Sequence, residues 1–353
     1  MQDIISHSLD NHTQSPHRDY LFDNIKALLI FLVAAVHFEA AVRSAYGACP
    51  VTDMLMLTAS SFHMPLFMII SGYFSKHVKR DRITDTVIIY LTAQALFFVY
   101  DFFLTYDMSL KGISLVRLLS PGFSMWYLFA LVWLRLFHKE LSQMKYPVAI
   151  SAVVSIAVMG SAMDTAGRQA IVKTLAHALY FIIGLRITPE HIHRLRRLPK
   201  ALFAAGIAAG AGVLLLITKA SSIISPHTLR LMTIRAQSAD NLGGGVRPYL
   251  MYVFVTVLAL FMSAMIVGIM PDKPTFFSVF GRNTVTVYIA QAFVYLMLRA
   301  AAGRLTGFIP SYLMNIFAAA LAIACVAATG NNRVAGLFNK WIQFVEKLAF
   351  KVI

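Results

Sequence analysis

The chain has 353 residues, of which 58% are apolar and 13% charged, and its mean hydropathy is +0.69. This composition is too apolar and too weakly charged for a soluble domain of this length. The formal net charge of +15 does not indicate a nucleic-acid partner, because the basic residues lie between apolar runs and form no recognisable nucleic-acid motif. Cys49 and Cys325 lie near opposite ends of the chain, so they provide neither a disulfide framework nor a zinc-like spacing.

The apolar runs predict an all-α, polytopic membrane protein with about ten transmembrane helices. A helix needs about 20 apolar residues to cross a hydrocarbon core of roughly 30 Å. The runs do not alternate in polarity as the strands of a spanning barrel do. We place the spans at about 25–46, 53–74, 83–105, 123–138, 146–163, 170–186, 201–219, 248–269, 283–301 and 309–329.

Three segments follow from this pattern. Residues 1–20 form a polar cytoplasmic N-terminal tail without the layout of a cleaved signal peptide, and residues 21–330 form the transmembrane domain. Residues 331–353 predict an amphipathic cytoplasmic helix, because apolar residues recur there at helical intervals at Val334, Leu337, Phe338, Trp341, Val345 and Leu348.

The basic residues predict the orientation. Ten spans place both termini on one side of the membrane, and nineteen of the 31 Lys and Arg residues fall on that side, most compactly in 186–200. Eleven fall on the other side, and Arg135 lies within a span. The positive-inside rule therefore predicts cytoplasmic termini, in a multi-pass protein of the cell inner membrane.

His37 is the first candidate for chemistry. It lies about 12 residues, or roughly 18 Å, into the first span. An ionisable group at that depth indicates function, although a neutral histidine bonded between helices would also fit. Lys26 and Asp23 share the helical face of His37. Lys26 is about 16 Å from His37 along the axis, so only a long substrate could touch both.

The second span carries another candidate group. It contains Phe62-His63-Met64-Pro65-Leu66-Phe67 and Ser71-Gly72-Tyr73, and the cations Lys76, Lys79 and Arg80 follow it. This cluster either anchors the helix at the lipid headgroups or, beside Lys26, binds the phosphates of a nucleotide-containing donor.

These two helices resemble those of the acyltransferase type 3 family, and within it the branch that contains fucose O-acetylase-like enzymes. The resemblance rests on Asp23-Asn24-Ile25-Lys26-Ala27, on His37 and on the motifs of the second span. Trp126-Tyr127-Leu128 and Gly281-Arg282-Asn283-Thr284, with Tyr288, resemble later landmarks of the family. The likeness spans most of residues 18–330 and is most specific over 18–80.

The resemblance implies a membrane-bound O-acyltransferase, with acetyl as the default group, that moves the acyl group from cytoplasmic acyl-CoA to a carbohydrate or cell-envelope hydroxyl. His37 matches the catalytic histidine. Lys26 stands where the family often has arginine, and Gln291 stands where many members carry a second histidine. Acyl-CoA would be a co-substrate, with no bound cofactor and no metal. The expected substrate- and donor-binding residues are Lys26, Asp23, Lys76, Lys79, Arg80, His63, Trp126, Arg282 and Asn283.

The expected partners are the lipid bilayer, acyl-CoA and a carbohydrate or glycolipid acceptor, and the sequence is compatible with a homodimer. His37 would act either as general base in direct transfer or as the carrier of a covalent acyl group. A transporter or flippase that uses His37 as a proton relay is the main alternative, and a non-catalytic scaffold is a third. The 220–247 connection would face outward, where it could select the acceptor.

Overall fold

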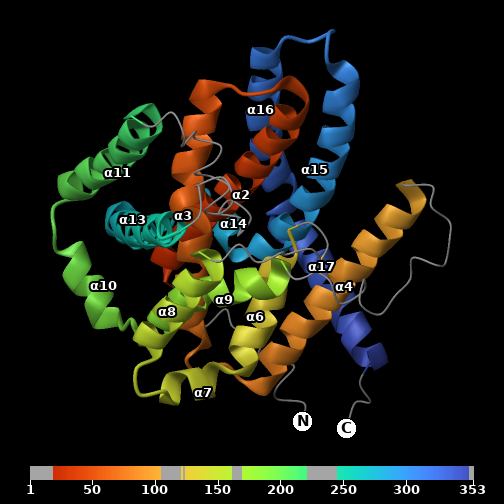
Figure 1. Ribbon diagram of the computed structural model, residues 1–353. Coiled ribbons are helices and arrows are strands. Elements are labelled where there is room, and N and C mark those ends of the chain that lie inside the picture. The colour runs from red at the N-terminus through yellow and green to blue at the C-terminus, as the bar shows by residue number, and fades with distance from the viewer. Residues whose placement is uncertain (1–18, 105–120, 122–123, 161–168, 221–244, 350–353) are drawn as a thin grey trace.

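The computed structural model describes residues 19–104, 121, 124–160, 169–220 and 245–349 (Figure 1). Within these ranges every regular element is a helix and no residue is in a strand. The expected all-α fold is therefore confirmed for the described part of the chain. Residues 1–18 of the tail predicted at 1–20, and most of the 220–247 connection, lie outside the described residues.

The helices follow the expected spans closely. In chain order they are α2 (Tyr20–Tyr46), α3 (Pro50–Ser75), α4 (Arg80–Leu104), α6 (Trp126–Leu136), α7 (His138–Gln143), α8 (Pro147–Gly160), α9 (Gln169–Arg186), α10 (Pro189–Arg196), α11 (Lys200–Ala220), α13 (Arg247–Ile269), α14 (Ser278–Arg282), α15 (Thr284–Leu305), α16 (Ser311–Thr329) and α17 (Asn332–Ala349).

Among the described residues, seven helices are long and apolar enough to cross a bilayer: α2, α3, α4, α11, α13, α15 and α16. The segment formed by α9 and α10 makes at most an eighth span, because it bends by 89° where Thr188 caps α10 and Pro189 begins it. The predicted spans at 123–138 and 146–163 correspond to α6 and α8, which have only 11 and 14 residues. Both are shorter than the roughly 20 residues that a crossing needs. The protein is polytopic, with seven or eight spans by this measure within the described ranges, and shorter apolar helices at two more of the roughly ten predicted spans.

The first two spans form the centre of the bundle. Helix α2 packs against α3, α14, α15 and α16, so helices from both ends of the described chain enclose it. Figure 1 shows α15 and α16 on one side of this pair and α11 and α13 on the other. Helix α2 is apolar all round and is buried on most of its surface, which is typical of a central helix.

Glycine allows α3 and α9 to cross in direct backbone contact. A Cβ atom on Gly72 would lie 2.0 Å from the carbonyl oxygen of Phe181, and one on Gly184 would lie 2.0 Å from that of Ile69. Such contacts between small residues are a common means of helix association in membranes. The Ser71-Gly72-Tyr73 motif thus fixes one face of α3 against α9.

Asn24 ties the start of α2 to the segment before α14. Its side-chain nitrogen donates to the carbonyls of Pro271 and Lys273, each at 2.9 Å. Its side-chain oxygen accepts from the hydroxyls of Thr275 at 2.7 Å and Ser278 at 2.6 Å. This fully buried amide therefore uses four hydrogen bonds to hold together segments that are distant in sequence.

The C-terminal helix α17 packs against α4, α15 and α16 on one side. Its other side exposes a stripe of apolar side chains, formed by Leu337, Trp341, Phe344 and Leu348. This stripe has the pattern of a helix that lies in the plane of a membrane interface.

Candidate functional site

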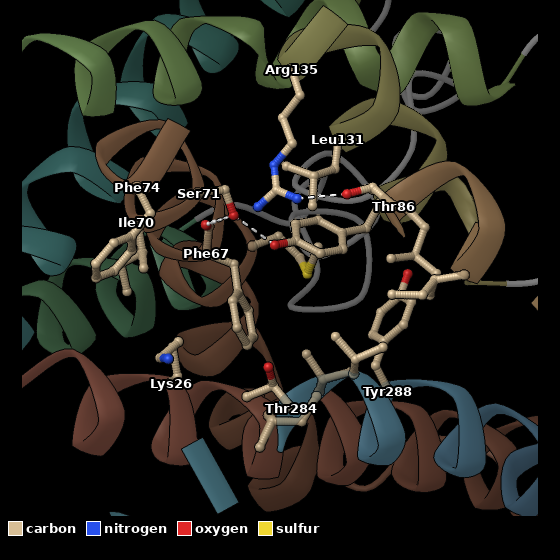
Figure 2. Close-up of a pocket in the computed structure, with 17 residues that line it drawn as sticks. Lys26, Phe67, Ile70, Ser71, Phe74, Thr86, Leu131, Arg135, Thr284 and Tyr288 are labelled. Carbon is tan, nitrogen blue, oxygen red and sulfur yellow. Dashed lines mark hydrogen bonds between the residues drawn. The ribbon is translucent and has the colours of Figure 1, made fainter. Parts of the chain in front are cut away.

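A cavity of about 290 Å³ lies between α2, α3, α4, α6 and α15 (Figure 2). Most of its wall is apolar, and the polar groups gather toward the ends of the helices that the sequence places on the cytoplasmic side. The lining residues are Lys26, Ile30, Val33, Met64, Phe67, Ile70, Ser71, Phe74, Thr86, Ile89, Tyr127, Leu128, Leu131, Arg135, Thr284, Val285 and Tyr288.

Lys26 reaches this cavity from the second turn of α2. Its ammonium group lies 3.0 Å from a carboxylate oxygen of Asp23, one turn earlier on the same face. Asp23 is almost fully buried, whereas the Lys26 side chain keeps 24% of its surface exposed. The carboxylate thus holds the lysine at the cavity wall and partly neutralises it.

Arg135 enters the cavity from the end of α6, on the wall opposite Lys26 (Figure 2). Its Nε donates to the Ser75 hydroxyl at 3.3 Å, and one terminal nitrogen donates to the Thr86 hydroxyl at 2.6 Å. These two bonds join α6 to α3 and α4 around a guanidinium group.

Two tyrosines form the wall between these cations and the interior. The Ser71 hydroxyl donates to the carbonyl of Phe67, so the Tyr127 hydroxyl donates to Ser71 at 2.7 Å. The Tyr288 hydroxyl donates to the carbonyl of Ser124, and the rings of Tyr127 and Tyr288 pack 5.6 Å apart. The rings are thus fixed by hydrogen bonds at their outer ends.

His37 lies one helical turn beyond Val33, the last α2 residue that lines the cavity, and does not itself belong to the lining. Its Nδ1 is 2.8 Å from the side-chain oxygen of Gln291 on α15, and its ring packs edge-on to Tyr295. The nitrogen of the Gln291 amide donates to the carbonyl of Tyr288 at 3.0 Å, which fixes the orientation of the amide.

This contact determines the tautomer of His37. The Gln291 oxygen can only accept, so Nδ1 of His37 must carry a proton and donate it. In the neutral ring the lone pair then belongs to Nε2. The uncharged Gln291 side chain thus fixes which nitrogen of neutral His37 carries the proton.

The three cations that follow α3 lie in different environments. Lys76 donates to the carbonyl of Ile187 and lies 4.3 Å from the centre of the Tyr73 ring, so it is directed toward the α9–α10 bend and is absent from the cavity lining. Burial lowers the pKa of its ammonium group. Lys79 and Arg80 are exposed at the start of α4.

The remaining predicted site residues lie outside the cavity lining. His63 is buried, and its Nδ1 is 2.9 Å from the carbonyl of Ala59. Trp126 packs against His177 with ring centres 4.7 Å apart. Arg282 is exposed, and Asn283 donates to the carbonyl of Gly330 at 2.8 Å, which joins α14 to the end of α16. The structure thus brings Lys26 to the cavity wall, with Asp23 paired to it, but not these four.

Arg135 and Thr86 belong to the cavity, although the sequence motifs did not select them. Arg135 was the one cation that the orientation analysis placed inside a span, and an intramembrane arginine indicates function by its cost alone. That signal was available from sequence, whereas the contact with Thr86 depends on how α4 packs against α6. No group of three or more His, Cys, Asp or Glu side chains suited to a metal occurs among the described residues.

The fold and the cavity define a polytopic helical membrane protein with a half-buried histidine that joins its first span to α15. A family model described as an acyltransferase domain, acyltransferase type 3, matches residues 19–329. The chain therefore belongs to this family of integral membrane acyltransferases. No curated protein and no solved structure matches the chain.

Proposed function

We propose that the protein transfers an acyl group, by default acetyl, from cytoplasmic acyl-CoA to a hydroxyl group of a carbohydrate or other cell-envelope acceptor. The observation that carries this proposal is the contact between His37 and Gln291. It supports a ring that donates from Nδ1 and that, when neutral, has its lone pair on Nε2, the form that a general base requires.

In this reaction Nε2 of His37 takes the proton of the acceptor hydroxyl as its oxygen attacks the thioester carbonyl carbon. A C–O bond forms and the C–S bond breaks. The imidazolium then returns the proton to the CoA sulfur, so the histidine is neutral again and the products are an ester and free CoA. Gln291 supports this cycle because its oxygen accepts from Nδ1 in both charge states of the ring.

The donor would lie along the cavity with its phosphates at the cytoplasmic end, where Lys26 lines the wall. Lys79 and Arg80 are exposed and would attract the anionic donor to this side. The reactive end would point toward His37, which is about 16 Å further along the α2 axis. The likeness of the first two helices to fucose O-acetylase-like enzymes favours a sugar acceptor.

The test is release of CoA from acetyl-CoA by purified protein in nanodiscs, measured with a panel of sugar acceptors. We expect turnover by wild type and a loss of at least about 100-fold in His37→Ala, the scale of general-base catalysis. His177→Phe is the matched control, because it removes a different intramembrane imidazole, which is buried, and keeps an aromatic ring beside Trp126. Equal turnover by wild type and folded His37→Ala would refute the role of His37.

A further inference from the structure

The guanidinium group of Arg135 has donors that the protein itself does not use. Arginine has five N–H groups, and Arg135 uses two of them, toward the hydroxyls of Ser75 and Thr86. The other three find no acceptor among the residues that the structure describes. Since the side chain lines the cavity, these donors are available to a molecule that occupies it (Figure 2).

Arg135 also has no counter-ion within 4.0 Å among the described residues. The hydroxyls of Ser75 and Thr86 donate their own protons to the carbonyls of Ser71 and Arg82, so they accept from Arg135 without bringing negative charge. Asp85, beside Thr86, lies 3.7 Å from Arg82 instead. A largely buried cation without a carboxylate is costly, and a bound anion would offset that cost.

Lys26 adds a second positive group on the opposite wall of the same cavity. We propose that Arg135 and Lys26 together bind phosphate oxygens of the acyl donor, with Arg135 as the main anchor. The planar guanidinium suits the paired oxygens of a phosphate group, which Lys26 can contact only as a point charge. The identity of the donor rests on the proposed function, whereas the anion site itself rests on the geometry of Arg135.

The experiment measures binding of CoA and of pantetheine, which lacks every phosphate, by titration calorimetry with purified protein in nanodiscs. We expect wild type to bind CoA more tightly than pantetheine. Arg135→Gln should weaken CoA binding by about 10- to 100-fold, the worth of a charged hydrogen bond, and leave pantetheine binding unchanged. Lys139→Gln, which removes an exposed cation one turn further along the chain, is the matched control and should bind CoA as wild type does.

Arg135→Lys keeps the charge and loses the planar guanidinium, so we expect its CoA affinity to lie between those of wild type and Arg135→Gln. If Arg135→Gln does not fold, the CoA affinities of wild type and Arg135→Lys are compared to test the proposal. Equal affinity of wild type for CoA and pantetheine would overturn the proposal. So would an equal loss of both ligands in Arg135→Gln, since that is the signature of a structural role. Arg135-dependent stabilisation by soluble short-chain phosphatidylglycerol, with none by CoA, would assign the site to a lipid headgroup and likewise overturn it.

The same variants separate this inference from the reaction. His37→Ala should lose turnover and keep CoA binding, whereas Arg135→Gln should lose CoA binding and raise the KM for acetyl-CoA more than it lowers kcat. Arg135-dependent CoA binding without turnover in wild type would refute the proposed function and leave the anion site standing.

Discussion

The contact between His37 and Gln291 leads to a prediction about proton placement. Gln291→Leu removes the acceptor and keeps a side chain of similar size, so Nδ1 of His37 loses the partner that fixes its proton. A hydrogen bond of this kind contributes about 1 kcal/mol, which corresponds to a roughly five-fold change in the ratio of the two tautomers. Gln291 acts through His37 and is a positioning residue.

A five-fold change in the tautomer ratio lowers the population of the Nδ1–H form by at most that factor, so we expect kcat of Gln291→Leu to fall by up to about fivefold, with the KM for acetyl-CoA unchanged. Gln291→Glu keeps an oxygen that accepts from Nδ1 and should retain most of the activity. Nitrogen NMR of protein with ¹⁵N-labelled histidine should show the Nδ1–H form of His37 in wild type and a mixture in Gln291→Leu. Full activity in Gln291→Leu, or the same tautomer in both proteins, would refute this reasoning.

Three further predictions concern the fold. Gly184→Ala places a Cβ against the backbone of Ile69 and should destabilise the α3–α9 crossing by about 1–3 kcal/mol, seen as a lower Tm in detergent; an unchanged Tm would contradict that close contact. Asn24→Leu leaves four polar partners, among them the buried Ser278, without their hydrogen bonds and should lower the free energy of unfolding by at least about 2 kcal/mol in chemical unfolding; an unchanged free energy of unfolding would contradict the role of this amide. Trp341 should be quenched by lipids brominated near the headgroup in a variant without the other two tryptophans, and its emission would be insensitive to such lipids if α17 stayed in water.

The helices could be predicted from the sequence because local apolar runs determine them. Every predicted span overlaps a helix, and the place of His37 in the interior of the first helix follows from its position within such a run. Seven or eight spans are long enough to cross a bilayer among the described residues, and α6 and α8 are shorter apolar helices at two further predicted spans.

The site could be predicted only in part. Lys26 and Asp23 follow from the geometry of a single helix, and the structure places both beside the cavity. Gln291 meets His37 across 254 residues, and no local pattern encodes a pairing at that separation. Lys76 and Asn283 were selected from motifs, but their contacts with backbone carbonyls depend on the α9–α10 bend and on α16.

The closure of α2 by the last third of the chain has a consequence for biosynthesis. The first helix leaves the ribosome before its hydrogen-bond partners have been synthesised. The partner of Asn24 at Lys273 follows 249 residues later, and Gln291, the partner of His37, follows 254 residues later. Until then a polar amide and an imidazole must remain in the membrane without their final partners, which is unfavourable in lipid. The proposed catalytic arrangement of His37 and Gln291 can therefore form only after α15 has been synthesised. A chain that terminates before residue 271 lacks the partners of both Asn24 and His37 described here.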